Sequence, residues 1–150
     1  KDIIIMIKLM TINDIPRVKD IFSLSFDKSQ RLMEYYKGFE EYIDFSIKQG
    51  YAFVICNDVN EIIGFINGYE IPDMMYGKTL YIENIAVIPC EQRKGYGKAL
   101  MNQIEKTAKS KGIREISLRT LCYMESYAIY LHLGFIDQRS DSRYLVKKIT

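Results

Sequence analysis

Residues 81–108 read YIENIAVIPCEQRKGYGKALMNQIEKTA, and this stretch decides the fold that the sequence predicts. Residues 81–88 are rich in aromatic and β-branched side chains, which predicts a strand. Pro89 ends the strand because proline has no N–H to donate to a β-ladder. From Leu100 onward, apolar residues recur at helical spacing, and the lysines before Gly112 are typical of a helix C-terminus. The stretch therefore predicts a strand, a glycine-bearing loop and a helix in succession.

The loop at the start of this helix predicts an anion site. Its glycines leave backbone N–H groups accessible at the positive end of the helix dipole, an arrangement suited to phosphate. Two common nucleotide patterns do not fit. The Rossmann fingerprint needs a glycine where Leu100 stands. The Walker pattern needs a glycine at Gln92 and a serine or threonine at Ala99, so a different phosphate-bearing ligand is expected.

Length and composition predict one soluble globular domain over residues 1–150. Hydrophobic residues make up 48% of the 150-residue chain and charged residues 27%, which is ordinary for such a domain. The net charge is +2 with both signs interleaved, so no nucleic-acid partner is expected. No apolar run approaches the roughly 18 residues of a membrane span, and residues 1–10 are interpreted as a strand rather than a signal peptide.

The cysteines predict neither a disulfide framework nor a metal site. Cys56, Cys90 and Cys122 are odd in number and lack metal-ligand spacing, which favours a reducing, cytoplasmic location. A cysteine nucleophile needs a base, and His132 is the sole histidine. Sequence position does not exclude such a pairing in space, but inert thiols and a surface histidine are the favoured interpretation.

Outside the opening stretch, periodicity and turn residues predict alternating strands and helices. Gly38 is expected to split or bend the second helical region. Residues 72–78 are expected to form a loop that presents Met74 and Met75. The predicted strands are 3–10, 51–56, 62–71, 115–121 and a final hairpin of 135–138 with 144–149, and the predicted helices are 15–26, 29–48 and 123–133.

The glycine loop resembles a known cofactor loop. The pattern Gln92-x-x-Gly95-x-Gly97, placed after a strand that ends in Val-Ile-Pro, is similar to the acetyl-CoA loop of the GNAT N-acetyltransferase superfamily. The family pattern is arginine or glutamine, two residues, glycine, one residue, and glycine or alanine. The order of the predicted elements is also similar to that of the family over nearly the whole chain.

The last predicted helix carries a second matching stretch, YMESYAIYLHLGF. Tyr130, Gly134 and Phe135 stand at the spacing with which GNAT enzymes end this helix. Two departures are present. Ser126 stands where the family usually has alanine, and Tyr123 stands where it often has an asparagine that contacts the cofactor. A tyrosine can stack or hydrogen-bond in place of that asparagine.

The resemblance implies an α+β fold with a central, mostly antiparallel twisted sheet of about six to seven strands and about four helices, splayed between strands 4 and 5. It implies acetyl-CoA as the cofactor and a cradle for its pyrophosphate formed by Gln92, Arg93, Lys94, Gly95, Tyr96, Gly97 and Lys98, mostly through backbone N–H groups. It further implies that Ile85, Ala86 and Val87 pair with the pantetheine arm, and that Tyr130 lies beside the sulfur.

In acetyl transfer to an amine, removing a proton from the amine is a larger energetic demand than protonating the leaving thiolate. Deprotonating an amine of pKa about 10.4 at pH 7 costs about 4.6 kcal/mol, whereas a thiolate leaving from a thiol of pKa about 8.5 costs about 2 kcal/mol. Glu83 is the candidate base, directly or through water, because it lies two residues before Ile85 and so on the same face of the expected strand. A solvated surface carboxylate is the alternative.

Tyr130 is the candidate general acid, with a merely packed tyrosine as the alternative. Tyr123 and Tyr127 are expected on the same helical face, so one of them is able to take its place or to contact the cofactor. No metal is expected in the mechanism.

The sequence therefore predicts an N-acetyltransferase that transfers the acetyl group of acetyl-CoA to a primary amine in a ternary complex. The amine belongs to a small molecule, such as a polyamine, aminoglycoside or amino acid, or to a peptide or protein. A non-catalytic acyl-CoA-binding module is the alternative, and a nucleotide-binding regulatory domain is a third. Many members of the family dimerise through edge strands, and the sequence leaves the homodimer open. Acids expected to attract a cationic amine are Glu34, Glu40, Glu41, Asp44, Glu70 and Asp73.

Overall fold

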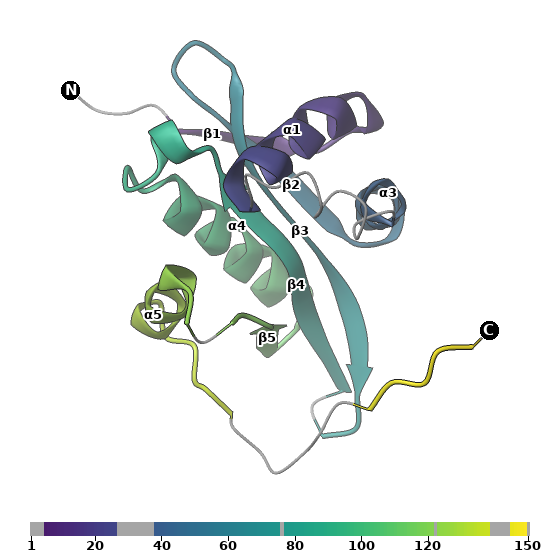
Figure 1. The fold of residues 1–150 in the computed structure, drawn as a ribbon. Helices are drawn as coiled ribbons and strands as arrows, with labels where there is room; N and C mark the ends of the chain where they lie inside the picture. Colours follow the sequence, from purple (N-terminus) through teal and green to yellow (C-terminus); the bar gives the residue numbers. More distant parts are fainter. Residues whose placement is uncertain (1–4, 27–37, 76, 122, 139–144, 150) are drawn as a thin grey trace. The chain divides into compact units, whose positions relative to one another are not determined.

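The computed structural model describes residues 5–26, 38–75, 77–121, 123–138 and 145–149 (Figure 1). The chain divides into two compact units, Lys1–Arg119 and Thr120–Thr150.

The first unit is built on a five-stranded sheet. Its strands lie in sequence order, and each pairs with the next one along the chain. The first four are antiparallel, whereas the fifth is parallel to the fourth and is reached by a helical crossover. The strands are β1 (Met6–Leu9), β2 (Tyr51–Cys56), β3 (Ile62–Asp73), β4 (Gly77–Val87) and β5 (Glu115–Leu118).

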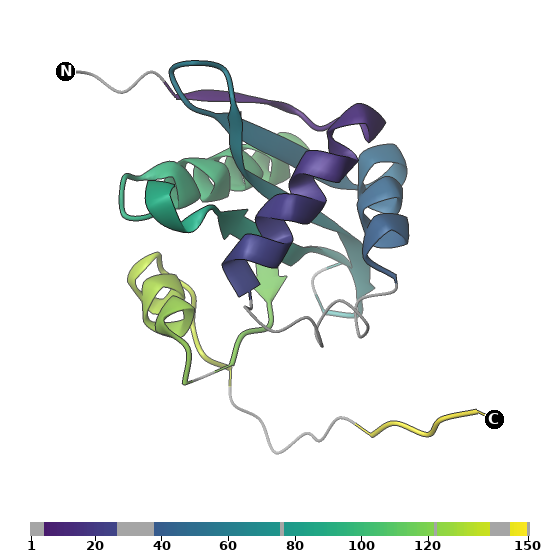
Figure 2. The same cartoon turned by 45° about the horizontal axis from the view of Figure 1, so that its top comes forward.

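Helices cover both faces of this sheet. α1 (Ile15–Phe26) and α3 (Phe39–Gln49) pack on one face, and α4 (Tyr96–Ser110) packs on the other (Figures 1 and 2). Each helix buries an apolar stripe, because its apolar residues recur every three or four positions. On α4 the stripe consists of Leu100, Met101, Ile104 and Ala108, all buried. The core on the other face includes Val18, Ile21, Phe22, Phe39, Ile43, Val54, Phe65 and Ala86.

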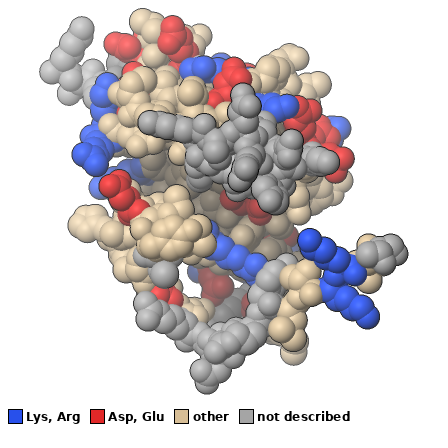
Figure 3. Space-filling model, viewed as in Figure 1, with Lys and Arg blue, Asp and Glu red and all other residues tan. Residues whose placement is uncertain are grey.

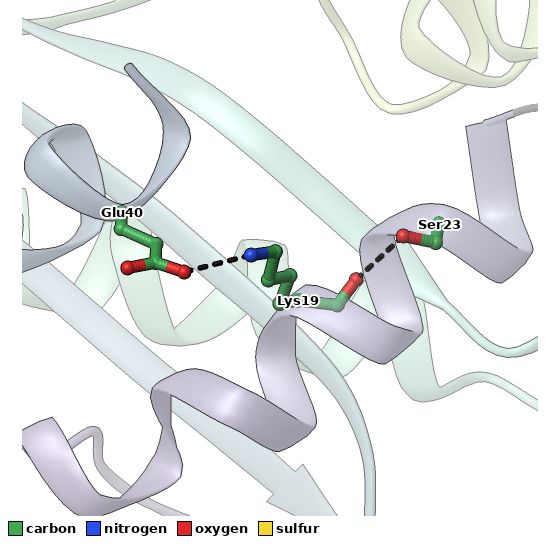
Figure 4. Close-up of polar contacts among 3 residues, drawn as sticks. All are labelled: Lys19, Ser23 and Glu40. Atoms are coloured by element: carbon green, nitrogen blue, oxygen red, sulfur yellow. Dashed lines mark hydrogen bonds and ion pairs between the residues drawn. The ribbon is translucent and has the colours of Figure 1, made fainter. Parts of the chain in front are cut away.

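Apolar packing rather than charge holds α1 against α3. The rings of Phe22 and Phe39 lie 4.5 Å apart between centroids. Lys19 Nζ reaches Glu40 Oε1 at 2.8 Å, and the Ser23 hydroxyl donates to the Lys19 carbonyl at 3.0 Å (Figure 4). The Lys19 and Glu40 side chains are 42% and 60% exposed, so their ion pair contributes at most about 1 kcal/mol. Acidic and basic side chains are interspersed over these helices (Figure 3).

The second unit contains one described helix, α5 (Glu125–His132). The Phe135 N–H donates to the Tyr130 carbonyl at 3.0 Å, and Gly134 follows the helix with φ 96°, the left-handed conformation in which glycine commonly ends a helix. None of the helices in the described ranges of either unit is long and apolar enough to cross a membrane.

The α+β class and the mostly antiparallel sheet are confirmed, but the predicted strand number is wrong for the described residues. The described ranges hold five strands, and neither 135–138 nor 145–149 is a strand. A strand needs a partner ladder and a face to bury, and Leu145, Val146 and Ile149 are all strongly exposed. The turn of the predicted hairpin, 139–144, lies outside the described residues.

Several predicted boundaries also change. Gly38 immediately precedes α3, and residues 29–37 of the predicted second helical region lie outside the described residues. The predicted loop 72–78 is shorter, because Pro72 pairs with Lys78 and both strands continue almost to the Met74–Met75 tip. β5 ends at Leu118 rather than at Leu121.

Candidate active site

A bulge in β4 sets the position of Glu83, the candidate base. Asn67 of β3 pairs with Asn84 and Gly68 pairs with Ile82, so Glu83 is an extra residue that has no partner on β3. Gly68 lies so close to the Tyr81 carbonyl that a Cβ would collide with that oxygen. Only glycine therefore fits opposite the bulge.

β4 presents an open edge beyond this bulge. The ladder with β5 ends at the Ile82–Leu118 pair, whereas β4 continues to Val87. The Ile88 N–H donates to the opposite Ile63 carbonyl at 2.9 Å. Because alternate residues of an antiparallel strand bond to the same neighbour, Ile85 and Val87 direct their N–H and C=O groups away from β3. No described strand pairs with these groups, so the sheet opens between β4 and β5.

The loop after β4 leaves several N–H groups exposed at the start of α4. Gly95 is the N-cap residue of α4 with φ 91°, a left-handed conformation that glycine adopts without strain. The first helical hydrogen bond runs from the Ala99 N–H to the Gly95 carbonyl at 3.0 Å. Within the described part of the chain, the N–H groups of Tyr96, Gly97 and Lys98 therefore have no acceptor. These N–H groups lie where the sequence predicts an anion site.

The side chains of residues 92–98 differ in exposure and in the contacts that they make. The Gln92 side-chain amide donates to the Val87 carbonyl at 2.8 Å, which ties the loop to the end of β4. Tyr96 is buried, so only its backbone is available to a ligand. Arg93 and Lys98 are exposed, and Lys94 lies 3.2 Å from a carboxylate oxygen of Glu91. The loop thus adds positive charge to the N-terminus of α4.

Glu83 lies on the α3 side of the sheet. Its Oε2 accepts a hydrogen bond from the Tyr69 hydroxyl at 3.3 Å, and the Tyr69 ring packs against Phe45 of α3, with centroids 5.8 Å apart. Burial, together with the Glu83 carboxylate, raises the pKa of Tyr69 to about 12. Tyr69 therefore keeps its proton and remains a donor to Glu83.

The prediction that Glu83 and Ile85 share a face is wrong. Ala86 belongs to the core with α1 and α3, so its neighbour Ile85 points to the α4 side. The bulge adds one residue between Glu83 and Ile85, and this extra residue reverses the expected alternation.

Tyr130 lies in the second unit. Its ring packs edge-on against Phe135 with centroids 5.8 Å apart, and burial raises the pKa of its hydroxyl. The hydroxyl makes no hydrogen bond to a described residue. The Tyr127 hydroxyl, in contrast, donates to Asp137 Oδ2 at 2.6 Å. Tyr123 precedes α5 and is 81% exposed, so the prediction that it shares a helical face with Tyr130 is wrong.

The described thiols and acids form no metal site. Cys56 is buried and Cys90 is exposed, and both are free thiols. No group of three histidine, cysteine or acidic side chains is placed to hold a metal ion among the described residues. Cys122 lies outside them.

Comparison with known proteins decides the family. Residues 15–135 match the family model described as the acetyltransferase (GNAT) family. This chain belongs to the acetyltransferase (GNAT) family. The GNAT chain is 32% identical over 82 residues to GCN5-related N-acetyltransferase 3, chloroplastic, of Arabidopsis thaliana. The match covers 55% of the chain but 32% of the plant protein, so the chain spans about a third of this curated relative.

Solved structures share the fold of this GNAT chain. An aminoglycoside 6′-N-acetyltransferase from Acinetobacter baumannii has a TM-score of 0.76 at 18% identity, covering 97% of this chain and 99% of that one. A putative acetyl transferase from Pyrococcus furiosus has a TM-score of 0.71 at 25% identity, with the same coverages. An aminoglycoside N-acetyltransferase solved in complex with CoA has a TM-score of 0.76 at 18% identity, covering 99% of this chain and 98% of that one.

Sequence reasoning missed the residues that surround Glu83. The missed residues are Tyr69, which donates to Glu83, and Phe45, against which Tyr69 packs. The available signal was Gly68, because a glycine inside a strand often marks a bulge or a close backbone approach.

Proposed function

We propose that this GNAT chain is an N-acetyltransferase that transfers the acetyl group of acetyl-CoA to a primary amine in a ternary complex. The observation that carries the proposal is the open edge of β4 at Ile85–Val87, followed directly by N–H groups of α4 that have no acceptor among the described residues. An extended chain ending in a diphosphate fits these two features, because the edge offers strand-like hydrogen bonds and the helix terminus offers an anion site.

The chain's own residues would hold this ligand from both ends. The backbone from Gln92 to Lys98 would bind the pyrophosphate. Along the segment Ile85–Val87, the Ile85 N–H and C=O and the Val87 N–H would pair with the pantetheine arm, whereas Ala86 bonds to β3. The Ile85 N–H points to the open edge, where it is available to a developing oxyanion. One such donor typically contributes a few kcal/mol to transition-state stabilisation. Bound acetyl-CoA supplies the acetyl group.

Glu83 is the proposed base, acting directly or through water. The Tyr69 hydroxyl fixes the carboxylate at the bulge, next to the open edge. Tyr130 is the proposed acid for the leaving thiolate. Its hydroxyl, which has no partner among the described residues, and its raised pKa fit a proton donor that stays protonated at neutral pH.

We further propose that both units belong to one catalytic domain, because the family match over residues 15–135 spans the two. A cytoplasmic location and a homodimer remain predictions from the sequence and the family.

Release of CoA thiol on incubation with acetyl-CoA and a panel of amines tests the proposal. We expect amine-dependent release at rates above the background hydrolysis of acetyl-CoA. A non-catalytic acyl-CoA-binding module would bind acetyl-CoA in calorimetry without amine-dependent release. Preferential binding of NAD or ATP would instead support a regulatory nucleotide-binding domain and contradict both.

A further inference from the structure

A cluster of aromatic side chains covers the α3 face of the sheet next to the bulge. This aromatic patch comprises Tyr42 and Phe45 of α3, Tyr69 of β3 and Tyr81 of β4. The Tyr69 ring lies 5.8 Å from Phe45 and 5.7 Å from Tyr81 between centroids. Tyr42 is 49% exposed and Phe45 42% exposed, so the patch presents apolar and π-electron surface to solvent.

Glu83 adjoins the aromatic patch. Its carboxylate accepts the Tyr69 hydroxyl at 3.3 Å, and its side chain is exposed. Burial raises the pKa of the Tyr81 hydroxyl, an effect that the Glu83 carboxylate increases and the Arg119 guanidinium opposes. The Glu83 carboxylate therefore acts on Tyr81 as well as on Tyr69.

Most of the neighbouring acids are already held by lysines. Glu40 pairs with Lys19 at 2.8 Å, and Asp44 pairs with Lys48 at 2.8 Å. Glu70 points to the opposite, α4 face of β3, where it accepts the Tyr51 hydroxyl at 2.6 Å and lies 3.4 Å from Lys78 Nζ. Within the described part of α3, only Glu41 is an acid without an ion pair. The carboxylates near the patch that have no ion pair among the described residues are therefore Glu83 and Glu41, which is exposed and lies one helical turn before Phe45.

The patch and the proposed cofactor site lie on opposite faces of the same strand. The anion site belongs to α4, which covers one face, whereas Tyr69, Tyr81 and Glu83 lie on the α3 face. A ligand on the patch would thus reach the open edge of β4 from the side opposite to the cofactor loop.

We propose that the aromatic patch and Glu83 form the acceptor site for a monocationic primary amine that carries an aromatic body. The body would stack on Tyr81 and Phe45, and the ammonium would contact Glu83. A polycation such as an aminoglycoside matches less well, because two of the three acids of α3 are already paired with lysines. The inference rests on the proposed acetyltransferase function.

The protons and bonds of the proposed transfer can be followed with Glu83 as the base. The ammonium first gives one proton to Glu83, directly or through water. The neutral nitrogen then forms a bond to the acetyl carbonyl carbon, and the carbon–sulfur bond breaks. The nitrogen loses its second proton, and the sulfur leaves with the electron pair and takes up one proton. The products are the N-acetyl amide and CoA thiol, with one proton left on Glu83.

The test compares acceptors that share an amine but differ in body and charge. We would measure kcat/KM with phenylethylamine, methylamine, spermidine and kanamycin, at saturating acetyl-CoA. We expect phenylethylamine to exceed each of the others by about 10-fold or more, the discrimination that an apolar contact supplies. A higher kcat/KM for kanamycin or spermidine would overturn the inference while leaving the acetyltransferase function intact.

Variants separate the patch from general effects on folding. Tyr81→Leu and Phe45→Leu should each lower kcat/KM for phenylethylamine about 10-fold more than they lower the value for methylamine. The matched control is Tyr51→Leu, which replaces a half-buried tyrosine of β2 on the α4 face. Equal losses with both amines in a patch variant would contradict the inference.

Binding without turnover provides an independent readout. Saturation-transfer NMR should detect phenylethylamine on the wild-type chain and a weaker signal on Tyr81→Leu and Glu83→Gln. If acetyl-CoA neither binds nor releases thiol with any amine, the proposed function fails, and the NMR result alone decides whether the patch binds arylalkyl amines. An unchanged signal in both variants would overturn the site.

Discussion

The backbone conformation of Gly95 orients the N–H groups of the proposed anion site. Gly95 has φ 91°, and an ideal Cβ built there would meet no other part of the chain within 4 Å. The need for glycine at this position is therefore conformational rather than a matter of space inside the unliganded chain. An L-residue would have to leave this region of φ, and the N–H groups of Tyr96 and Gly97 would turn with it.

We expect Gly95→Ala to weaken acetyl-CoA binding about 10-fold or more, because the strain of about 1 kcal/mol is relieved by moving the loop. Isothermal titration calorimetry would measure the affinity. The matched control is Gly112→Ala, since Gly112 follows the same helix with φ 71° and also has open space at its Cβ. Equal loss of affinity in both variants would mean that the effect is one of global stability.

A substitution at Tyr130 tests the proposed catalytic role separately from acetyl-CoA binding. Tyr130→Phe removes the hydroxyl and keeps the ring that packs on Phe135. We expect kcat to fall about 100-fold with the dissociation constant for acetyl-CoA unchanged, since a general acid acts in the transition state. Tyr51→Phe, which removes a hydroxyl elsewhere, should leave kcat unchanged. Unaltered turnover in Tyr130→Phe would remove this residue from the mechanism.

At the scale of the elements, a buried polar contact joins α3 to the central strand. The Asn67 side-chain amide donates to the Ser46 hydroxyl at 3.0 Å, and both side chains are fully buried. Asn67 Oδ1 accepts no hydrogen bond from a described residue. The contact lies next to the bulge, so it also fixes the strand that carries Tyr69.

Ser46→Ala should destabilise the fold by about 1–3 kcal/mol, because the Asn67 amide then loses its buried acceptor. Urea unfolding followed by circular dichroism would measure this change. Ser110→Ala is the control, since the Ser110 hydroxyl donates to the Thr107 carbonyl at an exposed helix end. A loss no larger than in the control would indicate that water replaces the hydroxyl.

Local patterns predicted most of the elements but not the bulge. The strand, loop and helix around Gly95 follow from residues that act within one turn of each other, and all three are confirmed. The register shift at Glu83 depends on Gly68 of another strand, which the pattern of β4 alone does not contain. The prediction of the final hairpin is wrong for a related reason. Leu145 and Val146 have high strand propensity, but propensity alone does not supply a neighbouring strand with which to pair.

At the scale of the whole molecule, pairs of tyrosine and carboxylate link stability to alkaline pH. Tyr51 donates to Glu70 Oε1 at 2.6 Å, and Tyr69 donates to Glu83 Oε2 at 3.3 Å. Burial, and secondly the Glu70 carboxylate, raises the pKa of Tyr51 from 10.0 to about 12. Burial, and secondly the Glu83 carboxylate, raises the pKa of Tyr69 from 10.0 to about 12. The folded state therefore holds these two protons more tightly than the unfolded state does.

This difference sets the sign of the pH dependence. A tyrosine whose pKa rises on folding stabilises the folded state. This stabilisation is complete below the unfolded-state pKa of 10.0 and is lost as the pH rises through the folded-state pKa of about 12. We expect the free energy of unfolding to fall between these values, with a shallower fall in Tyr51→Phe and in Tyr69→Phe. Urea unfolding across this range would measure the slopes. Tyr123→Phe, at a residue 81% exposed, should keep the wild-type slope, and a slope unaffected by either substitution would exclude both pairs as its cause.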